Sequence, residues 1–219
     1  MRFKAIIFDL DGVLVFTDRF HYQAWKALAD RLGIYFDETI NNRLRGVSRM
    51  ESLDIILERS ETEYSQEEKE ALAAEKNEQY RKLLAAMTPA DVSPEVRSTL
   101  AELKRRGHRL AVGSSSKNAK FILERVGLTE VFDAVSDGTN ITRSKPDPEV
   151  FLKAAEFLGE PPENCAVVED AFAGIDAAQA AGMLAVGVGG AASYEKADQA
   201  LGRFAGLLEL FDGKEGASK

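Results

Sequence analysis

The chain has 219 residues, 45% hydrophobic and 29% charged, which is enough to build a sizeable core in one large domain or two small ones. Its formal net charge of -8 argues against broad binding of nucleic acid or of anionic membranes, although a local basic pocket for a phosphate is compatible with it. The single cysteine, Cys165, excludes an internal disulfide framework. We find neither a secretory signal nor a stretch apolar enough to span a bilayer, and we expect a cytoplasmic protein.

The first predicted element is a buried strand over residues 5–8, which ends in two acids, Asp9 and Asp11. Side chains two residues apart on an extended segment point to the same side, so both carboxylates should face one site at the carboxyl end of the strand. Open α/β sheets bind their ligands there. Two close carboxylates repel, and the pair therefore calls for a bound cation or for different protonation states. A turn cap after a strand is the alternative explanation.

Residues 18 to 86 form a different kind of segment. They contain three helical patterns, near 20–32, 50–59 and 66–86, and no convincing strand. The segment returns through the string "MTPADVSP", whose prolines and small polar residues are typical of a linker. We interpret it as a small helical domain inserted after the first strand.

From residue 91 onward, strands and helices alternate. Short apolar runs predict buried parallel strands at 110–113 and 166–168, with further candidates at 132–136 and 184–188. Helical patterns lie between them, and they cover 94–106, 117–126, 148–158 and 174–181. This alternation predicts a doubly wound parallel-sheet α/β domain.

Three further polar groups follow predicted strands or loops of this domain. Ser114, Ser115 and Ser116 end one strand and lead into a helix, where hydroxyls and helix-terminal amides could bind an anion, or where a serine could simply cap the helix. Lys145 precedes a proline and is expected on extended or turning backbone. Glu169 and Asp170 end another strand, and hard oxygen ligands of this kind suit Mg²⁺.

In their order, "DLDGV", Ser114, Lys145 and "ED" resemble the motifs of the haloacid dehalogenase-like phosphotransferase superfamily. The strings "HYQAWKALADRLGI", "LRGVSRMESL", "GSSSKN" and "VEDAFAGI" are similar to those of the β-phosphoglucomutase family within it. The resemblance implies a Rossmann-like α/β core over residues 1–16 and 89–219 and an inserted α-helical cap over 17–88. His108, in "RRGHRL", has no place in these motifs and is expected on the exposed surface.

The resemblance also implies a chemistry for the core residues. Asp9 would be the nucleophile that carries a phosphoryl group as an aspartyl-phosphate, and Asp11 the general acid and base. One Mg²⁺ per chain would be held by Asp9, the backbone carbonyl of Asp11 and Asp170, with Glu169 close by. Ser114 and Lys145 would bind the oxygens of the transferring phosphoryl group.

A mutase of this kind needs a second phosphate site, because its intermediate is β-glucose 1,6-bisphosphate. The resemblance assigns the distal phosphate to Arg49, which is suited to bidentate phosphate recognition, with core residues opposite it. The substrate-binding positions that it implies are His21, Trp25, Gly46, Val47, Arg49, Ser52, Lys76, Ser115, Ser116 and Asn118. Packing within the cap is the alternative role for Trp25 and His21.

The implied activity is the interconversion of β-D-glucose 1-phosphate and D-glucose 6-phosphate by a monomer, with small sugar phosphates as its partners. A Mg-dependent phosphatase of the same superfamily, acting on small sugar phosphates, is the alternative, and a non-catalytic sugar-phosphate-binding or metal-binding module is a third. One departure stands out, because the family commonly has Thr-Asp-Thr where this chain has Val15, Phe16 and Thr17. An aromatic side chain thus replaces a polar one at the hinge that the resemblance implies.

Overall fold

The computed structural model describes residues 3–44 and 47–212. The chain divides into two compact units, one made of Met1–Phe16 with Thr88–Lys219 and the other of Thr17–Met87. We call them the α/β unit and the helical unit. Among the described residues, no helix is long and apolar enough to cross a membrane.

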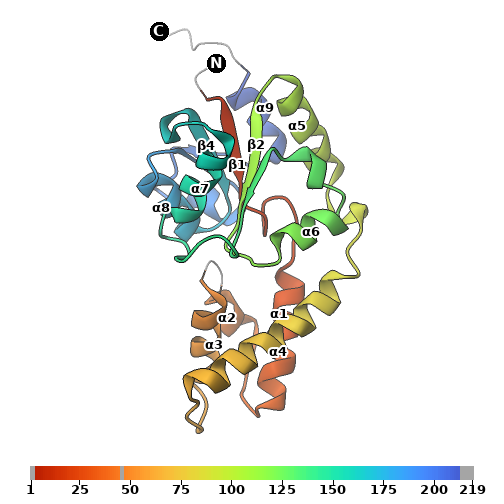
Figure 1. Cartoon of the computed structure of the whole chain (residues 1–219), viewed down its shortest axis with the longest axis vertical. Coiled ribbons are helices and arrows are strands. Elements are labelled where there is room, and N and C mark those ends of the chain that lie inside the picture. Colours follow the sequence, from red (N-terminus) through yellow and green to blue (C-terminus); the bar gives the residue numbers. More distant parts are fainter. Residues whose placement is uncertain (1–2, 45–46, 213–219) are drawn as a thin grey trace. The chain divides into compact units, whose positions relative to one another are not determined.

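The α/β unit is built on a six-stranded parallel sheet of order β3-β2-β1-β4-β5-β6 (Figure 1). Its central strand β1 is flanked by β2 and β4, so that Phe8 at its end lies beside Val112 and Val168. Strand β1 is apolar throughout, and β2 and β4 are apolar except for Arg109 at the start of one and Glu169 at the end of the other, as expected where helices cover both faces of a sheet. The strands are β1 (Ala5–Phe8), β2 (Arg109–Gly113), β3 (Ala134–Ser136), β4 (Cys165–Glu169), β5 (Leu184–Gly187) and β6 (Gln199–Ala200).

Helices lie on the two sides of this sheet (Figure 1). One core layer joins α7 and α8 to the sheet, with Phe151 and Ile175 packed against Ile7 and Val167. On the other side, Phe204 packs its ring 5.8 Å from that of Phe8. The helices of this unit are α5 (Pro94–Arg105), α6 (Ala119–Arg125), α7 (Glu149–Leu158), α8 (Phe172–Ala180) and α9 (Leu207–Leu210).

The strand order reverses direction between β1 and β4. Crevices in open α/β sheets form at such a switch point, outside the carboxyl ends of the strands. Asp9 follows β1 directly, and its backbone N–H donates to Val168 O of β4 at 3.0 Å. Glu169 is the last residue of β4. The fold therefore brings the two acid pairs of the sequence to the position where such sheets bind ligands.

The helical unit has its own hydrophobic core. Trp25, Leu28, Leu53 and Ile56 are buried in it together with Leu72. Serines begin two of its helices with reciprocal hydrogen bonds to a glutamate three residues on, a capping box that satisfies the first amides of the helix. The helices are α1 (Asp18–Arg31), α2 (Glu38–Asn42), α3 (Arg49–Leu57) and α4 (Gln66–Leu84).

The sequence patterns missed two short elements. Helix α2 spans five residues, and strand β6 spans two exposed ones, so neither provides enough apolar positions to define a period. Strand β3 covers only 134–136 of the expected 132–136, because Asp133 uses its side chain to accept a hydrogen bond from Leu110 N. Irregular backbone at Asp133 thus replaces the start of that strand.

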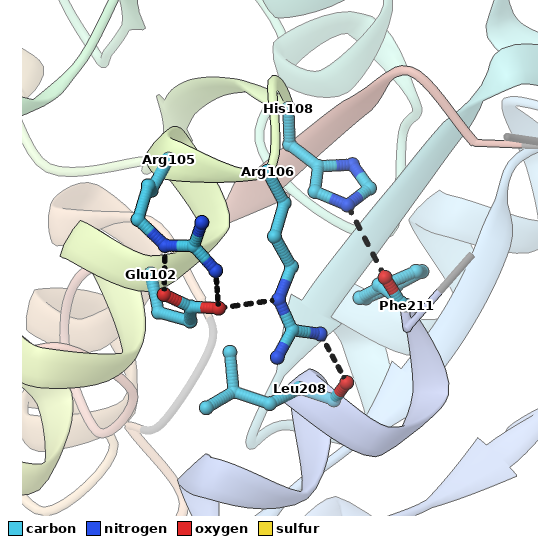
Figure 2. Close-up of polar contacts among 6 residues, drawn as sticks. All are labelled: Glu102, Arg105, Arg106, His108, Leu208 and Phe211. Atoms are coloured by element: carbon cyan, nitrogen blue, oxygen red, sulfur yellow. Dashed lines mark hydrogen bonds and ion pairs between the residues drawn. The ribbon is translucent and has the colours of Figure 1, made fainter.

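The expectation that His108 is exposed is wrong. Its side chain is only 3% exposed, and its Nε2 lies 3.4 Å from Phe211 O (Figure 2). The rings of His108 and Phe211 meet edge to face at 5.7 Å. The charged neighbours in "RRGHRL" suggested a surface segment, but Phe211, which follows α9, packs against the imidazole.

Candidate active site

A buried lysine joins the two acid pairs at the switch point. Lys145 Nζ donates to Asp9 Oδ1 at 2.5 Å and also to Glu169 Oε1. All three side chains are buried, and Asp9 is 6% exposed. A buried charge is tolerated when it is paired and hydrogen-bonded, and here one ammonium group serves two carboxylates.

The electrostatics of this triad follow from burial and from the close charges. Burial by itself would lower the pKa of Lys145, but the carboxylates of Asp9 and Glu169 outweigh it and raise the pKa. Burial raises the pKa of Glu169, and the Lys145 ammonium opposes that shift. Lys145 is therefore a fixed positive charge at neutral pH, placed directly against Asp9.

Asp9, Glu169 and Asp170 form an acidic cluster whose ligand atoms all lie within 4.8 Å of one another. Two glycines leave the space that the side chains of Asp170 and Glu169 occupy in this cluster. A Cβ at Gly12, whose φ is +92°, would lie 2.1 Å from Asp170 Oδ2, and one at Gly174 would lie 2.0 Å from Glu169 Oε1. The cluster offers hard carboxylate oxygens, the donors that Mg²⁺ prefers, and so it fits that cation.

Glu169 differs from the other two acids in this cluster. One of its oxygens accepts from Lys145, and the other accepts from Ala171 N at 3.0 Å. Both oxygens are thus engaged within the protein. Asp170 is only partly buried, and Asp9 uses one oxygen toward Lys145. Asp9 and Asp170 are accordingly better placed than Glu169 to contact a cation directly.

Asp11 lies in a different environment from Asp9. The chain bends after β1, and a tight turn closes with Gly12 N donating to Val15 O at 2.7 Å. Asp11 is partly exposed on this turn, whereas Asp9 is buried. The two acids of "DLDG" are therefore not equivalent. A buried, lysine-paired carboxylate and a more accessible one suit different chemical roles.

The serine loop after β2 has an internal set of hydrogen bonds. Ser116 N donates to Ser114 Oγ at 3.1 Å, and Asn118 N donates to Ser116 Oγ at 3.2 Å. The following helix begins at Ala119, not near residue 117 as expected. These two amides are therefore used inside the loop, and the anion site predicted here stays a prediction that depends on the serine hydroxyls and the remaining amides. The hydroxyl hydrogen of the buried Ser114 remains able to donate.

In the helical unit, Lys76 is held by aromatic and imidazole groups. It is 2% exposed, its Nζ lies 3.0 Å from His21 Nδ1, and it sits 4.5 Å from the Trp25 ring centroid and 4.6 Å from that of Tyr80. Such contacts stabilise a desolvated cation. Burial first, and then the charges of Lys76 and Arg49, lowers the pKa of His21 well below 6.5. A neutral imidazole can accept from the ammonium group.

This cluster brings together three residues predicted from the sequence and one that was missed. Tyr80 lies four residues after Lys76 on α4, a spacing that places both on one helix face and that could have indicated it. Trp25 is a core residue of the helical unit, as its alternative role required, and its contact with a substrate stays a prediction.

Arg49 begins α3, and among the described residues no carboxylate forms an ion pair with it. Partial burial lowers the pKa of its guanidinium. Ser52 is buried one turn further along the helix, and Val47 is partly buried before it. A partly desolvated arginine without an acidic partner is suited to an anionic ligand. Gly46 lies outside the described residues.

Phe16 occupies an open position in the α/β unit. It is 71% exposed and contributes to a groove of about 240 Å³. Val13, Val188, Leu201 and Phe204 supply apolar walls to this groove. An exposed phenylalanine is thus placed beside apolar surface, although the sequence suggested no partner for it.

The parallel sheet, the acid pairs and lysine at its switch point, and the helical unit after β1 together define the class of protein. Residues 3–182 match the model of the haloacid dehalogenase-like hydrolase family, and the chain belongs to this family of enzymes. Within the family, it is 45% identical over 188 residues to the β-phosphoglucomutase of Bacillus subtilis strain 168, a match that covers 85% of this chain and 83% of that relative.

The chain is also similar to a solved mutase structure and to a phosphatase. A crystal structure of β-phosphoglucomutase from Clostridium difficile has a TM-score of 0.88 at 41% identity, covering 94% of this chain and 93% of that one. A fructose-1-phosphate phosphatase of Escherichia coli K12 is 35% identical and covers 85% of this chain and 97% of that relative. The family and the fold class predicted from the sequence are confirmed.

Proposed function

We propose that the enzyme is a β-phosphoglucomutase that interconverts β-D-glucose 1-phosphate and D-glucose 6-phosphate through β-glucose 1,6-bisphosphate. The observation that carries this proposal is the 45% identity over 85% of the chain to a β-phosphoglucomutase. The buried triad of Asp9, Lys145 and Glu169 supports it, because phosphoryl transfer depends on positioned charge.

In this proposal Asp9 attacks phosphorus, and an aspartyl-phosphate forms as the bond to the sugar oxygen breaks. Asp11 gives a proton to that leaving oxygen and, in the reverse step, takes one from the incoming hydroxyl. Lys145 offsets the negative charge of Asp9 and of the phosphoryl oxygens, and Ser114 donates its hydroxyl hydrogen to one of them. The different burial of Asp9 and Asp11 supports this division of roles.

Asp9 and Asp170, with the backbone carbonyl of Asp11, are proposed to hold one Mg²⁺, while Glu169 holds Lys145 in place. When bound, the ion supplies positive charge that reduces the repulsion between the carboxylates and the phosphate.

A bisphosphate intermediate requires a second anion site. We assign Arg49 to its distal phosphate, because this guanidinium has no acidic partner among the described residues. Ser116 and Asn118 of the serine loop are assigned to the same phosphate, and Ser115 to the transferring one. Lys76, with His21, is assigned to the sugar hydroxyls, together with Val47 and Ser52 and, outside the described residues, Gly46.

A coupled assay tests the activity. β-D-glucose 1-phosphate is supplied with Mg²⁺ and a catalytic amount of β-glucose 1,6-bisphosphate, and glucose 6-phosphate is followed through its dehydrogenase. We expect steady formation of glucose 6-phosphate with little free phosphate. Release of inorganic phosphate without glucose 6-phosphate would instead support the second candidate, a sugar phosphatase, which the 35% identity to a fructose-1-phosphate phosphatase favours.

We also propose that the enzyme acts as a monomer in the cytoplasm on small sugar phosphates. The net charge of -8 and the burial of the single cysteine support a chain that neither binds anionic surfaces nor forms disulfides. Size-exclusion chromatography with light scattering tests the monomer, and a mass near twice that of the chain would contradict it.

A further inference from the structure

A second loop lies directly against the serine loop. The turn after β3, residues 136–140, is joined to the serine loop after β2 by two backbone hydrogen bonds. Ser114 N donates to Ser136 O at 3.1 Å, and Gly138 N donates to Ser116 O at 3.2 Å. Because these bonds hold both ends of the segment 114–116, the turn 136–140 fixes the position of the serine loop at the end of the sheet.

Gly138 is the point of closest approach between the two loops. It is buried, and a Cβ built on it would lie 2.4 Å from Ser115 O and 3.0 Å from Lys117 N. Both of these atoms belong to backbone, which cannot rotate away as the end of a long side chain can. Any residue other than glycine must therefore displace the peptide that joins Ser115 to Ser116.

The side chain of Asp137 stabilises the turn through hydrogen bonds within it. It is 1% exposed, and its Oδ1 accepts from Thr139 N at 2.9 Å and from the Thr139 hydroxyl. Asn140 closes the turn, since its Oδ1 accepts from Ser136 Oγ at 3.1 Å and from Asp137 N at 3.3 Å. Side chains that bond to nearby backbone in this way hold an irregular turn in one conformation.

We infer that Gly138 and Asp137 are positioning residues for phosphate binding: the turn 136–140 sets the serine loop so that Ser114, Ser115 and Ser116 meet the phosphate groups of the substrate. The inference rests on the proposed function for the identity of that substrate. Its physical basis is the contact of Gly138 with Ser115 O and the two bonds between the loops, together with the internal brace of Asp137.

Binding of inorganic phosphate tests the inference without requiring turnover. The full chain with Mg²⁺ is titrated with inorganic phosphate and followed by backbone chemical shifts, as wild type and as Gly138→Ala. We expect about tenfold weaker binding in the variant, because small misplacements of binding groups cost one to two orders of magnitude. The Mg²⁺ concentration that gives half-saturation should stay unchanged, since Asp9, Glu169 and Asp170 lie at the ends of β1 and β4, whereas the turn follows β3. Equal phosphate affinity in both proteins would overturn the inference.

Gly202→Ala is the matched control, because no atom lies within 4 Å of a Cβ at that position. If Gly138→Ala does not fold, Asp137→Ala and Asp137→Asn take its place. Asparagine keeps an oxygen that can accept from Thr139, so we expect it to retain phosphate binding that alanine loses. Equal affinity in the alanine variant and the wild type would contradict the inference.

The same titration separates this inference from the proposed function. If the wild type forms no glucose 6-phosphate but Gly138→Ala still weakens phosphate binding, only the proposed activity fails. With an active wild type, KM for β-D-glucose 1-phosphate should rise about tenfold in Gly138→Ala, with a smaller change in kcat.

Discussion

At the scale of single residues, the two acids of "DLDG" are distinguished by what surrounds them. Asp9 is buried against Lys145, whereas Asp11 stands on the turn that Gly12 closes. The Lys145 ammonium group thus places a positive charge directly against the carboxylate that is proposed as the nucleophile. The sequence predicted two carboxylates at one edge, and the packing of Lys145 separates their roles.

Asp9→Asn is expected to lower turnover of β-D-glucose 1-phosphate by about a thousandfold or more, because removal of a nucleophile leaves only binding effects. The variant should also fail to retain radiolabelled phosphate after a quench in acid. Asp30→Asn is the control, since Asp30 is exposed and pairs with Lys26 on the same helix, α1. Full activity of the Asp9 variant would disprove the assignment.

Gly12→Ala should weaken the response to Mg²⁺. The new Cβ would lie 2.1 Å from Asp170 Oδ2 and must displace that carboxylate. We expect the Mg²⁺ concentration for half-maximal activity to rise about tenfold, in the range found when groups that orient metal ligands are disturbed.

Gly107→Ala separates this effect from backbone strain. Gly107 has a φ of +89°, close to the +92° of Gly12, but no atom lies within 4 Å of a Cβ there. Both variants should lose stability through backbone strain, Gly12→Ala the more because of its additional clash, and only Gly12→Ala should change the Mg²⁺ requirement. An equal change in the two would show that strain alone is responsible.

At the scale of elements, residues 205–208 are hydrogen-bonded to α5 and to the turn that follows it. Arg106 Nη1 donates to Leu208 O at 2.6 Å, and Glu95 Oε1 accepts from Ala205 N at 2.9 Å (Figure 2 shows the first of these). Hydrogen bonds from Arg105, and then from Arg106, lower the pKa of Glu102 to about 2. The carboxylate of Glu102 in turn orients Arg106 toward α9.

Arg106→Met is expected to destabilise the α/β unit by about 1–2 kcal/mol, the usual cost of losing a hydrogen bond made by a charged donor to a partly buried acceptor. The melting temperature should fall by a few degrees, with kcat unchanged. Arg105→Met is the matched control, because Arg105 also donates to Glu102, with both Nε and Nη2, but its side chain is 73% exposed. A similar loss in both variants would contradict the role given to Leu208 O.

Part of this arrangement of elements could be predicted from the sequence, and part of it could not. The strands of the sheet centre and the acids behind them could be predicted, because apolar runs and strand-end charges are local signals. Lys145 contacts Asp9, which lies 136 positions away in the sequence, and Glu169, which lies 24 positions away. No local pattern encodes contacts over such separations. The burial of His108 and the close approach of Gly138 to Ser115 were missed for the same reason.

At the scale of the whole molecule, the two units differ in what they supply. The α/β unit carries the acidic cluster with Lys145, and the helical unit carries Arg49 and the Lys76 cluster. Each unit contains one of the two histidines of the chain, His21 in one and His108 in the other. Each unit therefore carries one imidazole whose proton uptake can couple its stability to pH.

The pKa of both histidines lies below the ordinary value of 6.5. For His108 the main cause is burial, opposed by the carbonyl of Phe211, and for His21 it is burial followed by the charges of Lys76 and Arg49. Below pH 6.5 the unfolded chain therefore binds protons that the folded chain does not. Because stability rises with pH wherever the unfolded state holds more protons, it must fall as the pH drops from about 7 toward each folded pKa.

Thermal unfolding between pH 7.5 and 5.5 measures this effect, and the window lies above the ordinary pKa range of carboxyl groups. Glu169, whose pKa burial raises, is present in the wild type and in the histidine variants alike, so it does not affect their comparison. The melting temperature of the wild type should fall across it. His108→Gln should flatten the decline of the α/β unit, because glutamine has no proton to gain, even if the variant is less stable at pH 7.5. His21→Gln should do the same for the helical unit. An unchanged slope in His108→Gln would mean that the imidazole already takes up its proton in the folded state, and that its contact with Phe211 O is made by the charged form.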